Sequence, residues 1–195
     1  TAQAQSQAGD TREAILEGAA RRIHRDGYVG TSVAGICAEA GIAVGTFYGH
    51  FPSRKAMFDA LIDRARARMQ ADVDAATAGS RDVLELERLS FDAFFRHLQA
   101  NPWFPRIETE AAVWAPESYI RHFREIAAHW VAALRGCRAR GELGFYDERE
   151  LVVVAWILMT ARHHLATRYL RDAGPVPTLP GYVRAAWLDF AGHGL

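Results

Sequence analysis

The stretch TSVAGICAEAGIAVGTFYGHFPSRK, residues 31–55, predicts two short helices joined by a tight turn. The first carries apolar residues at helical spacing and stops at Gly41, a residue type that commonly ends helices. The second runs from Val44 to Phe51 and ends before Pro52, because proline disfavours helical geometry in the preceding residue. Two helices joined in this way form a helix-turn-helix, whose second helix can enter the major groove of DNA.

Polar groups lie on the predicted outer face of the second helix. Thr46, Tyr48 and His50 place hydroxyl and imidazole groups where phosphate oxygens could accept hydrogen bonds. Lys55, the only lysine among 23 basic residues, follows in the first turn of the next helix. Both Lys55 and Tyr48 also have a purely structural interpretation, as a solvated surface charge and as a half-buried ring that anchors the turn.

Residues 11–60 resemble the DNA-binding domain of the tetracycline-repressor (TetR) family of bacterial transcription regulators. The matching pieces are Gly27-Tyr28, Thr31-Ser32-Val33, Ile36, Ala40-Gly41-Ile42, the string GTFYGHF at 45–51 and Ser53-Arg54-Lys55. The resemblance implies an all-α, nine-helix architecture with a helix-turn-helix head and a helical body for ligand binding and dimerisation. The positions expected to contact DNA are Thr31, Ser32, Ala34, Val44, Gly45, Thr46, Tyr48, Gly49, His50 and Lys55.

The positions expected to face the groove depart from the family pattern. Ala43 stands where many members have Ser or another capping residue, and Gly49 replaces a larger side chain. The groove-facing set is Ala34, Ala43, Val44, Gly45, Thr46 and Gly49. Because this set lacks Arg, Asn and Gln, bidentate recognition of bases is not available from it. We expect specificity from apolar contact with thymine methyl groups, from Thr46 and from DNA shape.

Composition and charge limit the class of protein. Half of the 195 residues are hydrophobic, yet no apolar run reaches the ~18 residues of a membrane span, and no secretory signal is visible. Cys37 and Cys137 lie on apolar helix faces, which predicts buried free thiols and fits a reducing cytoplasm. The 23 basic and 23 acidic residues balance, so the local cations Arg21, Arg22, Arg25, Arg54 and Lys55 would carry a DNA contact of modest salt dependence.

The 3.6-residue periodicity of every long segment predicts an all-helical chain. We expect a flexible arm at 1–9, the helix-turn-helix domain at 10–52, a linking helix at 53–76 capped by Ser53, a loop at 77–80, and the ligand-binding and dimerisation domain at 80–195. Capping boxes are predicted at Asp10–Glu13 and Asp147–Glu150. Later helices are expected near 82–100, 105–114, 116–140, 147–172 and 179–190, with Gly174-Pro-Val-Pro177 before the last.

The body is rich in aromatic residues, most of which must be core. The family resemblance implies a ligand cavity among helices five to eight, and we expect Phe95, Trp103, Phe104, Trp114, Phe123, Trp156 and His163 to line it. The resemblance also implies a homodimer through the last two helices, with Val152, Val153, Trp156, Met159, His163, Tyr182, Ala185, Ala186 and Phe190 in its four-helix bundle. The predicted partners are a near-palindromic double-stranded operator and a small apolar or aromatic effector that releases the repressor.

Two other functions stay open. His122, Glu125 and His129 share one helix face, so the same fold could host a metal-responsive regulator, or a redox-responsive one through the cysteines. A helical interaction protein without DNA binding is the third interpretation. No nucleophile elbow or glycine-rich phosphate loop is present, and we expect no enzymatic activity and no cofactor.

Overall fold

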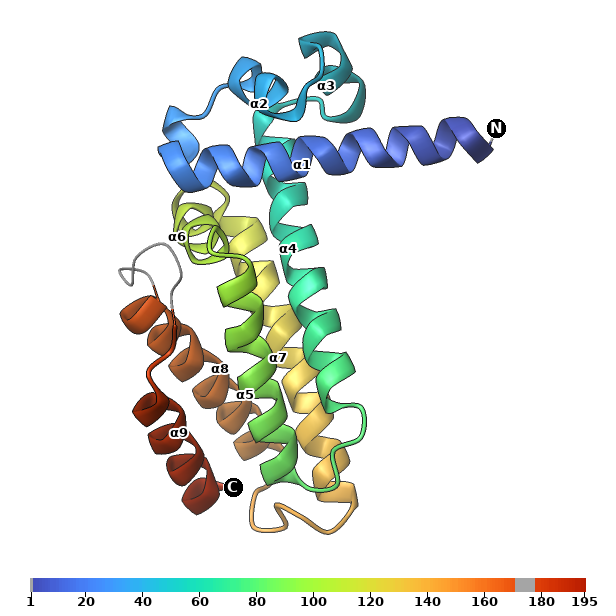
Figure 1. The fold of residues 1–195 in the computed structure, drawn as a ribbon. Coiled ribbons are helices and arrows are strands. Elements are labelled where there is room, and N and C mark those ends of the chain that lie inside the picture. The colour runs from blue at the N-terminus through green and yellow to red at the C-terminus, as the bar shows by residue number, and fades with distance from the viewer. Residues whose placement is uncertain (1, 171–177) are drawn as a thin grey trace. The chain divides into compact units, whose positions relative to one another are not determined.

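The computed structural model describes residues 2–170 and 178–195, with side chains from residue 7 onward, and within these ranges the regular structure is entirely α-helical. The helices are α1 (Ala2–Gly30), α2 (Val33–Ala40), α3 (Val44–His50), α4 (Arg54–Thr77), α5 (Val83–Ala100), α6 (Phe104–Trp114), α7 (Pro116–Ala139), α8 (Glu148–Leu170) and α9 (Gly181–Gly194) (Figure 1). The all-α prediction is confirmed. No helix in the described ranges has the length and apolar character needed to span a membrane.

Local capping explains where several helices begin. The Ser32 hydroxyl accepts the Gly35 N–H at 3.0 Å, and the Ser53 hydroxyl accepts the Ala56 N–H at 3.0 Å. Asp147 and Glu150 form the predicted capping box, in which each side chain accepts the other's backbone N–H, at 2.9 and 2.7 Å. Each contact satisfies backbone donors that the first helical turn leaves without an intrahelical partner.

The first helix differs from its prediction at its start. α1 begins at Ala2, so residues 2–9, expected to form an arm, are helical, and Asp10 lies inside the helix and does not cap it. Gln and Ala are good helix formers, and their lack of apolar periodicity does not prevent a helix from extending into solvent. The Gly174–Pro177 break lies outside the described residues.

The chain divides into two compact units. Unit 1 contains residues 1–66 and 103–120, and unit 2 contains residues 67–102 and 121–195. The division differs from the boundary expected at residues 77–80, because α6 packs on α1 within unit 1. Ile107 and Ala111 of α6 and Ala115 at its end are fully or almost fully buried among the residues of the helix-turn-helix. Residues of α4 and α7 contribute to both units.

Unit 1 has a continuous apolar core. Its most deeply buried side chains include Ile15, Leu16, Ile23, Ile36, Phe47, Phe51, Met57, Phe58 and Leu61. The Tyr28 ring lies 4.5 Å from that of Phe58, measured between centroids. Gly27 interrupts α1 with φ 74° and ψ 166°, a conformation that is essentially restricted to glycine. A Cβ atom at this position would lie 2.9 Å from both the Arg106 and the Glu110 side chains of α6.

Unit 2 encloses a buried ion pair within its apolar core. In this unit α5 packs with α8 and α9. The core includes Phe91, Leu98, Leu134, Leu151, Ala155, Leu158 and Trp187. The Arg162 guanidinium of α8 pairs with the Glu87 carboxylate of α5, and both side chains are at most 4% exposed. Both cysteines are buried free thiols, Cys37 in unit 1 and Cys137 in unit 2, as predicted.

Candidate nucleic-acid interface and effector region

The turn between α2 and α3 has the geometry that a helix-turn-helix requires. Gly41 adopts a left-handed conformation, with φ 68° and ψ 32°, and its N–H is directed to the Ala38 carbonyl oxygen. The following N–H, of Ile42, donates to the Cys37 carbonyl at 3.0 Å. Phe47, which is completely buried, and Phe51 then fix α3 against the rest of unit 1.

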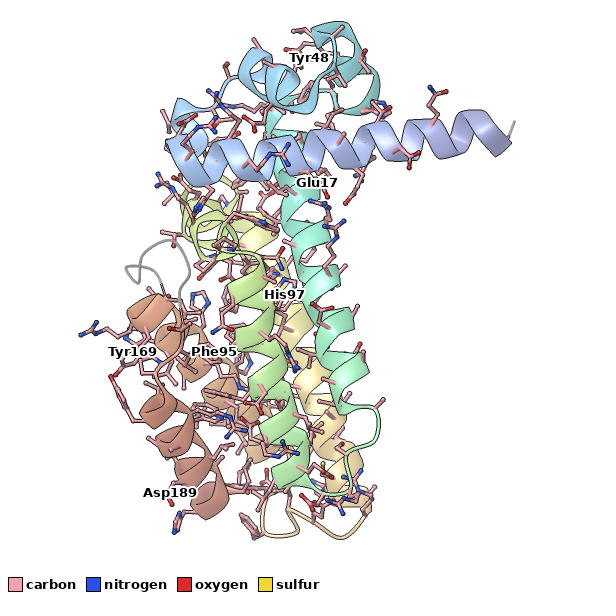
Figure 2. The ribbon with its side chains drawn as sticks, viewed as in Figure 1. Glu17, Tyr48, Phe95, His97, Tyr169 and Asp189 are labelled. Atoms are coloured by element: carbon pink, nitrogen blue, oxygen red, sulfur yellow. The ribbon has the colours of Figure 1, made fainter. Side chains whose placement is uncertain are left out.

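The opposite face of α3 is open to solvent. Val44 is 45% exposed and Tyr48 is 56% exposed. Figure 2 marks the position of Tyr48 on this helix. Gly45, Thr46 and Gly49 are exposed as well, and a Cβ atom on either glycine would meet nothing within 4 Å. A ligand could therefore approach the backbone of α3 closely. Ala43 makes no side-chain cap to α3, in agreement with the weak cap expected from its sequence.

Thr31 is a correction to the expected contact set. It is completely buried, its hydroxyl donates to the Gly27 carbonyl at 2.7 Å, and its own carbonyl accepts the Arg54 guanidinium. Thr31 therefore holds the turn between α1 and α2 and presents no side chain to DNA. Ser32 and Ala34 are exposed, and His50 is half-buried at the end of α3.

The cations near this surface are held by internal partners. Arg21 and Arg25 both pair with Glu39, at 3.1 and 3.2 Å, and Arg22 pairs with Asp26 at 3.0 Å. These ion pairs were not predicted from the sequence, although Arg22 and Asp26 have the i, i+4 spacing at which helical ion pairs form. Hydrogen bonds from Arg21 and Arg25 lower the pKa of the Glu39 carboxyl.

Arg54 and Lys55, at the start of α4, are also engaged. The Arg54 guanidinium lies 4.4 Å from the centre of the Tyr28 ring. The Lys55 ammonium lies 2.9 Å from the Asp59 carboxylate one turn later, and its side chain is 53% exposed. Asp59, chiefly through this hydrogen bond, raises the pKa of Lys55, and so does the more distant charge of Glu117. Lys55 thus stays charged and accessible.

The residues expected to line an effector pocket fall in both units. Trp103, Phe104 and Trp114 belong to unit 1, where Phe104 is buried and Trp114 stacks on Tyr28 at 6.0 Å between centroids. Phe95, Phe123, Trp156 and His163 belong to unit 2. There the Phe123 and His163 rings meet edge to face at 5.4 Å, Phe95 is buried, and Trp156 lies at the surface.

The histidine-rich face of α7 does not gather a metal site. His122 is buried beside Phe123, whereas His129 lies 2.9 Å from Asp74 of α4. In the described parts of the chain, no three His, Cys, Asp or Glu side chains come together in a group that could hold a metal ion.

Two helices of unit 2, α8 and α9, carry exposed apolar side chains. They are Val152, Val153, Trp156 and Ile157 on α8, and Tyr182 and Phe190 on α9. Ala185 and Ala186 are exposed on α9 too, while Met159 is buried and His163 half-buried. Most of the residues expected in a dimer bundle therefore lie at the surface of this subunit, where a second subunit could cover them.

Comparison with known proteins identifies the helix-turn-helix. Residues 15–61 match the family model described as bacterial regulatory proteins, tetR family. The chain is 32% identical over 127 residues to the HTH-type transcriptional regulator EthR of Mycolicibacterium smegmatis, a match that covers 64% of this chain and 58% of EthR. It is 26% identical over 167 residues to the nucleoid occlusion factor SlmA of Edwardsiella ictaluri, covering 83% of each chain.

Solved structures of similar fold include other transcriptional regulators. The crystal structure of the transcriptional regulator FadR from Bacillus subtilis in complex with stearoyl-CoA superposes with a TM-score of 0.81 at 14% identity, covering 94% of this chain and 98% of FadR. The matched motif, the open outer face of α3 and the nine described helices agree with one another. Residues 15–61 therefore carry the domain of the tetR family of bacterial regulatory proteins, and the described helices have the fold of solved tetR-family regulators.

Proposed function

We propose that this chain is a cytoplasmic, non-enzymatic repressor of transcription that binds a near-palindromic operator as a homodimer and is released by a small apolar or aromatic effector. The observation that carries the proposal is that α3 has one buried face and one exposed face. Phe47 is buried on one side, while Thr46 and Tyr48 are exposed on the other. A short helix held in this way presents its outer face to the major groove.

Sequence recognition by α3 would depend on shape and apolar contact. Ala34, Ala43, Val44, Gly45 and Gly49 offer no side-chain hydrogen bonds, and all five are exposed. Val44 can contact thymine methyl groups, and the Thr46 hydroxyl can bind a base or a phosphate. The two glycines let the helix backbone approach the bases, so the width and deformability of the groove add to the selection.

Phosphate contacts would come from few charged groups. Tyr48, His50 and Lys55 are the candidates on or next to α3, with Ser32 at the start of α2. The arginines of α1 are already paired with Glu39 and Asp26, so each would have to exchange its partner to bind DNA. We therefore expect the affinity to fall less steeply with salt than for DNA-binding proteins that make many lysine and arginine contacts.

The exposed apolar surface of α8 and α9 supports a homodimer. Val153, Ile157 and Phe190 are each about half exposed in the single subunit, and a four-helix bundle with a second copy would bury them. A two-fold dimer presents two copies of α3 to half-sites about one helical turn, ~34 Å, or a multiple of it apart. The operator should therefore be close to palindromic.

The effector would bind among the aromatic side chains of the body. Phe95, Phe123 and His163 supply apolar surface and one polar group within unit 2, as small-molecule sites commonly do. The ligand-bound structure of FadR shows that this fold can hold an acyl-CoA in another protein. Effector and operator would oppose each other with a coupling free energy of typically ~1–3 kcal/mol, and the antagonism must be reciprocal.

The test is selection of duplexes from a random-sequence DNA pool by the full chain, followed by affinity measurement on the enriched sequence. We expect a near-palindrome to be enriched and a scrambled duplex of the same composition to bind more weakly. A chain that enriches no sequence, while it remains folded by circular dichroism, would refute the proposal and favour a helical interaction protein.

A further inference from the structure

A carboxylate joins the exposed lysine of α4 to the start of α7. Lys55 precedes Asp59 by one turn of α4, and its ammonium lies 2.9 Å from the Asp59 Oδ2 atom. The Asp59 Oδ1 atom accepts a hydrogen bond of 2.7 Å from the Ser118 hydroxyl in the first turn of α7. All three residues lie in unit 1.

Burial changes along this chain of contacts. Ser118 is 3% exposed, the Asp59 side chain is 27% exposed and the Lys55 side chain is 53% exposed. The buried hydroxyl therefore fixes one oxygen of the carboxylate, and the other oxygen holds a cation at the surface. A free lysine side chain samples many rotamers, whereas this one has a defined partner and position.

A DNA phosphate and the Asp59 carboxylate would compete for the Lys55 ammonium. If both bound it at once, two negative charges would lie close together. An exposed ion pair of this kind contributes only a factor of about 1.5 to 5 to an equilibrium, so a phosphate can displace the carboxylate. The displaced carboxylate then remains near the phosphate and repels it. Asp59 thus opposes DNA binding by competition and by repulsion.

We propose that Asp59 and Ser118 are positioning residues that hold Lys55 in a retained state, from which an entering DNA phosphate must release it. The inference rests on the proposed function, since it requires that Lys55 contacts phosphate. The Ser118 hydroxyl orients the carboxylate toward Lys55, so the first turn of α7 sets how firmly the lysine is retained. Operator affinity is therefore lower than the contact surface alone would allow.

The experiment measures the affinity of the full chain for the duplex enriched by selection, at several salt concentrations. Asp59→Asn removes the competing charge, and we expect binding two- to fivefold tighter than that of the natural chain. Ser118→Ala releases the carboxylate without removing it, and should tighten binding by a smaller factor of about two. Ser118→Thr, which keeps the hydroxyl, should bind like the natural chain.

Lys55→Ala identifies the group through which both variants act. It should weaken binding and reduce the slope of log affinity against log salt by about one. When Lys55 is already Ala, Ser118→Ala should no longer increase operator affinity. Asp59→Asn should still increase it slightly, because it removes the repulsion between the Asp59 carboxylate and the DNA phosphate. A purely structural role of Asp59, in fastening α7 to α4, predicts the opposite sign, with weaker binding and a lower melting temperature for Asp59→Asn.

A matched control separates this effect from a change in net charge. Arg81 and Glu85 also form an exposed i, i+4 pair, at 3.0 Å, but in unit 2. Glu85→Gln changes the net charge as Asp59→Asn does and should leave operator affinity within twofold of the natural chain. Equal gains from both variants, or no gain from Asp59→Asn, would overturn the inference. Failure of the natural chain to bind any duplex would instead overturn the proposed function.

Discussion

The indole N–H of Trp187 donates a hydrogen bond of 2.6 Å to the carboxylate of Glu87, which lies 100 residues earlier in the chain. The same carboxylate oxygen receives the Arg162 guanidinium, which also lies 4.4 Å from the centre of the Trp130 ring. Burial lowers the pKa of the Arg162 guanidinium, and the charge of Glu87 offsets this lowering only in part. One buried carboxylate thus joins α5, α8 and α9 within unit 2.

Arg162→Met should destabilise unit 2 strongly, because it leaves the Glu87 charge buried without its cation. Loss of one partner of a buried pair costs about 3–5 kcal/mol, measurable by urea unfolding. The double variant Glu87→Leu with Arg162→Met should recover much of that loss, since neither charge remains. A double variant as unstable as Arg162→Met alone would contradict this account.

Tyr48→Phe should weaken operator binding without unfolding the head. The ring is retained against Phe47, at 5.4 Å between centroids, while the hydroxyl that we expect to bind phosphate is lost. We expect a cost of about 1 kcal/mol, roughly fivefold in affinity, and an unchanged melting temperature. The contrast is Phe47→Ala, which empties a fully buried position and should cost about 3–5 kcal/mol of folding free energy. Unchanged affinity in Tyr48→Phe would exclude a phosphate contact through this hydroxyl.

Gly27→Ala should lower the melting temperature. The backbone at this position is strained for any residue with a Cβ atom, and that atom would meet Arg106 and Glu110 at 2.9 Å. The conformational cost alone is about 1–3 kcal/mol. Gly136→Ala is the matched control, because it lies inside α7 with its nearest neighbour at 4.0 Å, and should stabilise the chain by about 0.5–1 kcal/mol.

Val153→Glu should dissociate the proposed dimer. Val153 and Ile157 lie one turn apart on the exposed apolar surface of α8, and a charge there would have to be buried in the bundle. Light scattering after size exclusion should show the mass of the single subunit, and operator affinity should fall at least tenfold. Leu84→Glu places the same charge at an exposed leucine of α5 and should leave the mass unchanged. A Val153→Glu chain of unchanged mass would argue against this interface.

The Arg81–Glu85 pair should give a stabilising contribution that acid removes. Hydrogen bonds from Arg81 lower the pKa of Glu85 from 4.5 to about 2. Because the folded-state pKa is the lower one, the contribution is complete above about pH 4.5 and is lost as the pH falls toward 2. The stability difference between the natural chain and Glu85→Gln should shrink over that interval. Carboxyl NMR titration of Arg81→Gln should show the Glu85 pKa moving back toward 4.5.

Features encoded by neighbouring residues could be predicted from the sequence. The capping box of Asp147 and Glu150, the Ser53 cap and the helix end at Gly41 each depend on residues within a few positions of one another. The outer face of α3 was predicted from the same short segment, and Thr46 and Tyr48 are exposed there.

Features that depend on residues far apart in the sequence could not be predicted in this way. The sequence contains Glu87, Arg162 and Trp187 on three separate helices, and nothing local indicates that they meet. The environment of Thr31 is distant in part: its hydroxyl donates to the nearby Gly27 carbonyl, but its own carbonyl is bound by Arg54 from α4. The retention of Lys55 had a local part, the i, i+4 spacing to Asp59, and a distant part, the Ser118 hydroxyl of α7.

The presence of a single lysine in the sequence has a practical consequence for labelling and immobilising this protein. The sequence contains one lysine, and its amine stands half exposed at the start of α4 beside α3. Coupling to an amine-reactive sensor chip or dye would modify side chains at this single position, which we propose contacts DNA. Acetylation there would abolish the charge, whereas reductive methylation would keep it, so the two reagents together would report on the lysine without any change of sequence.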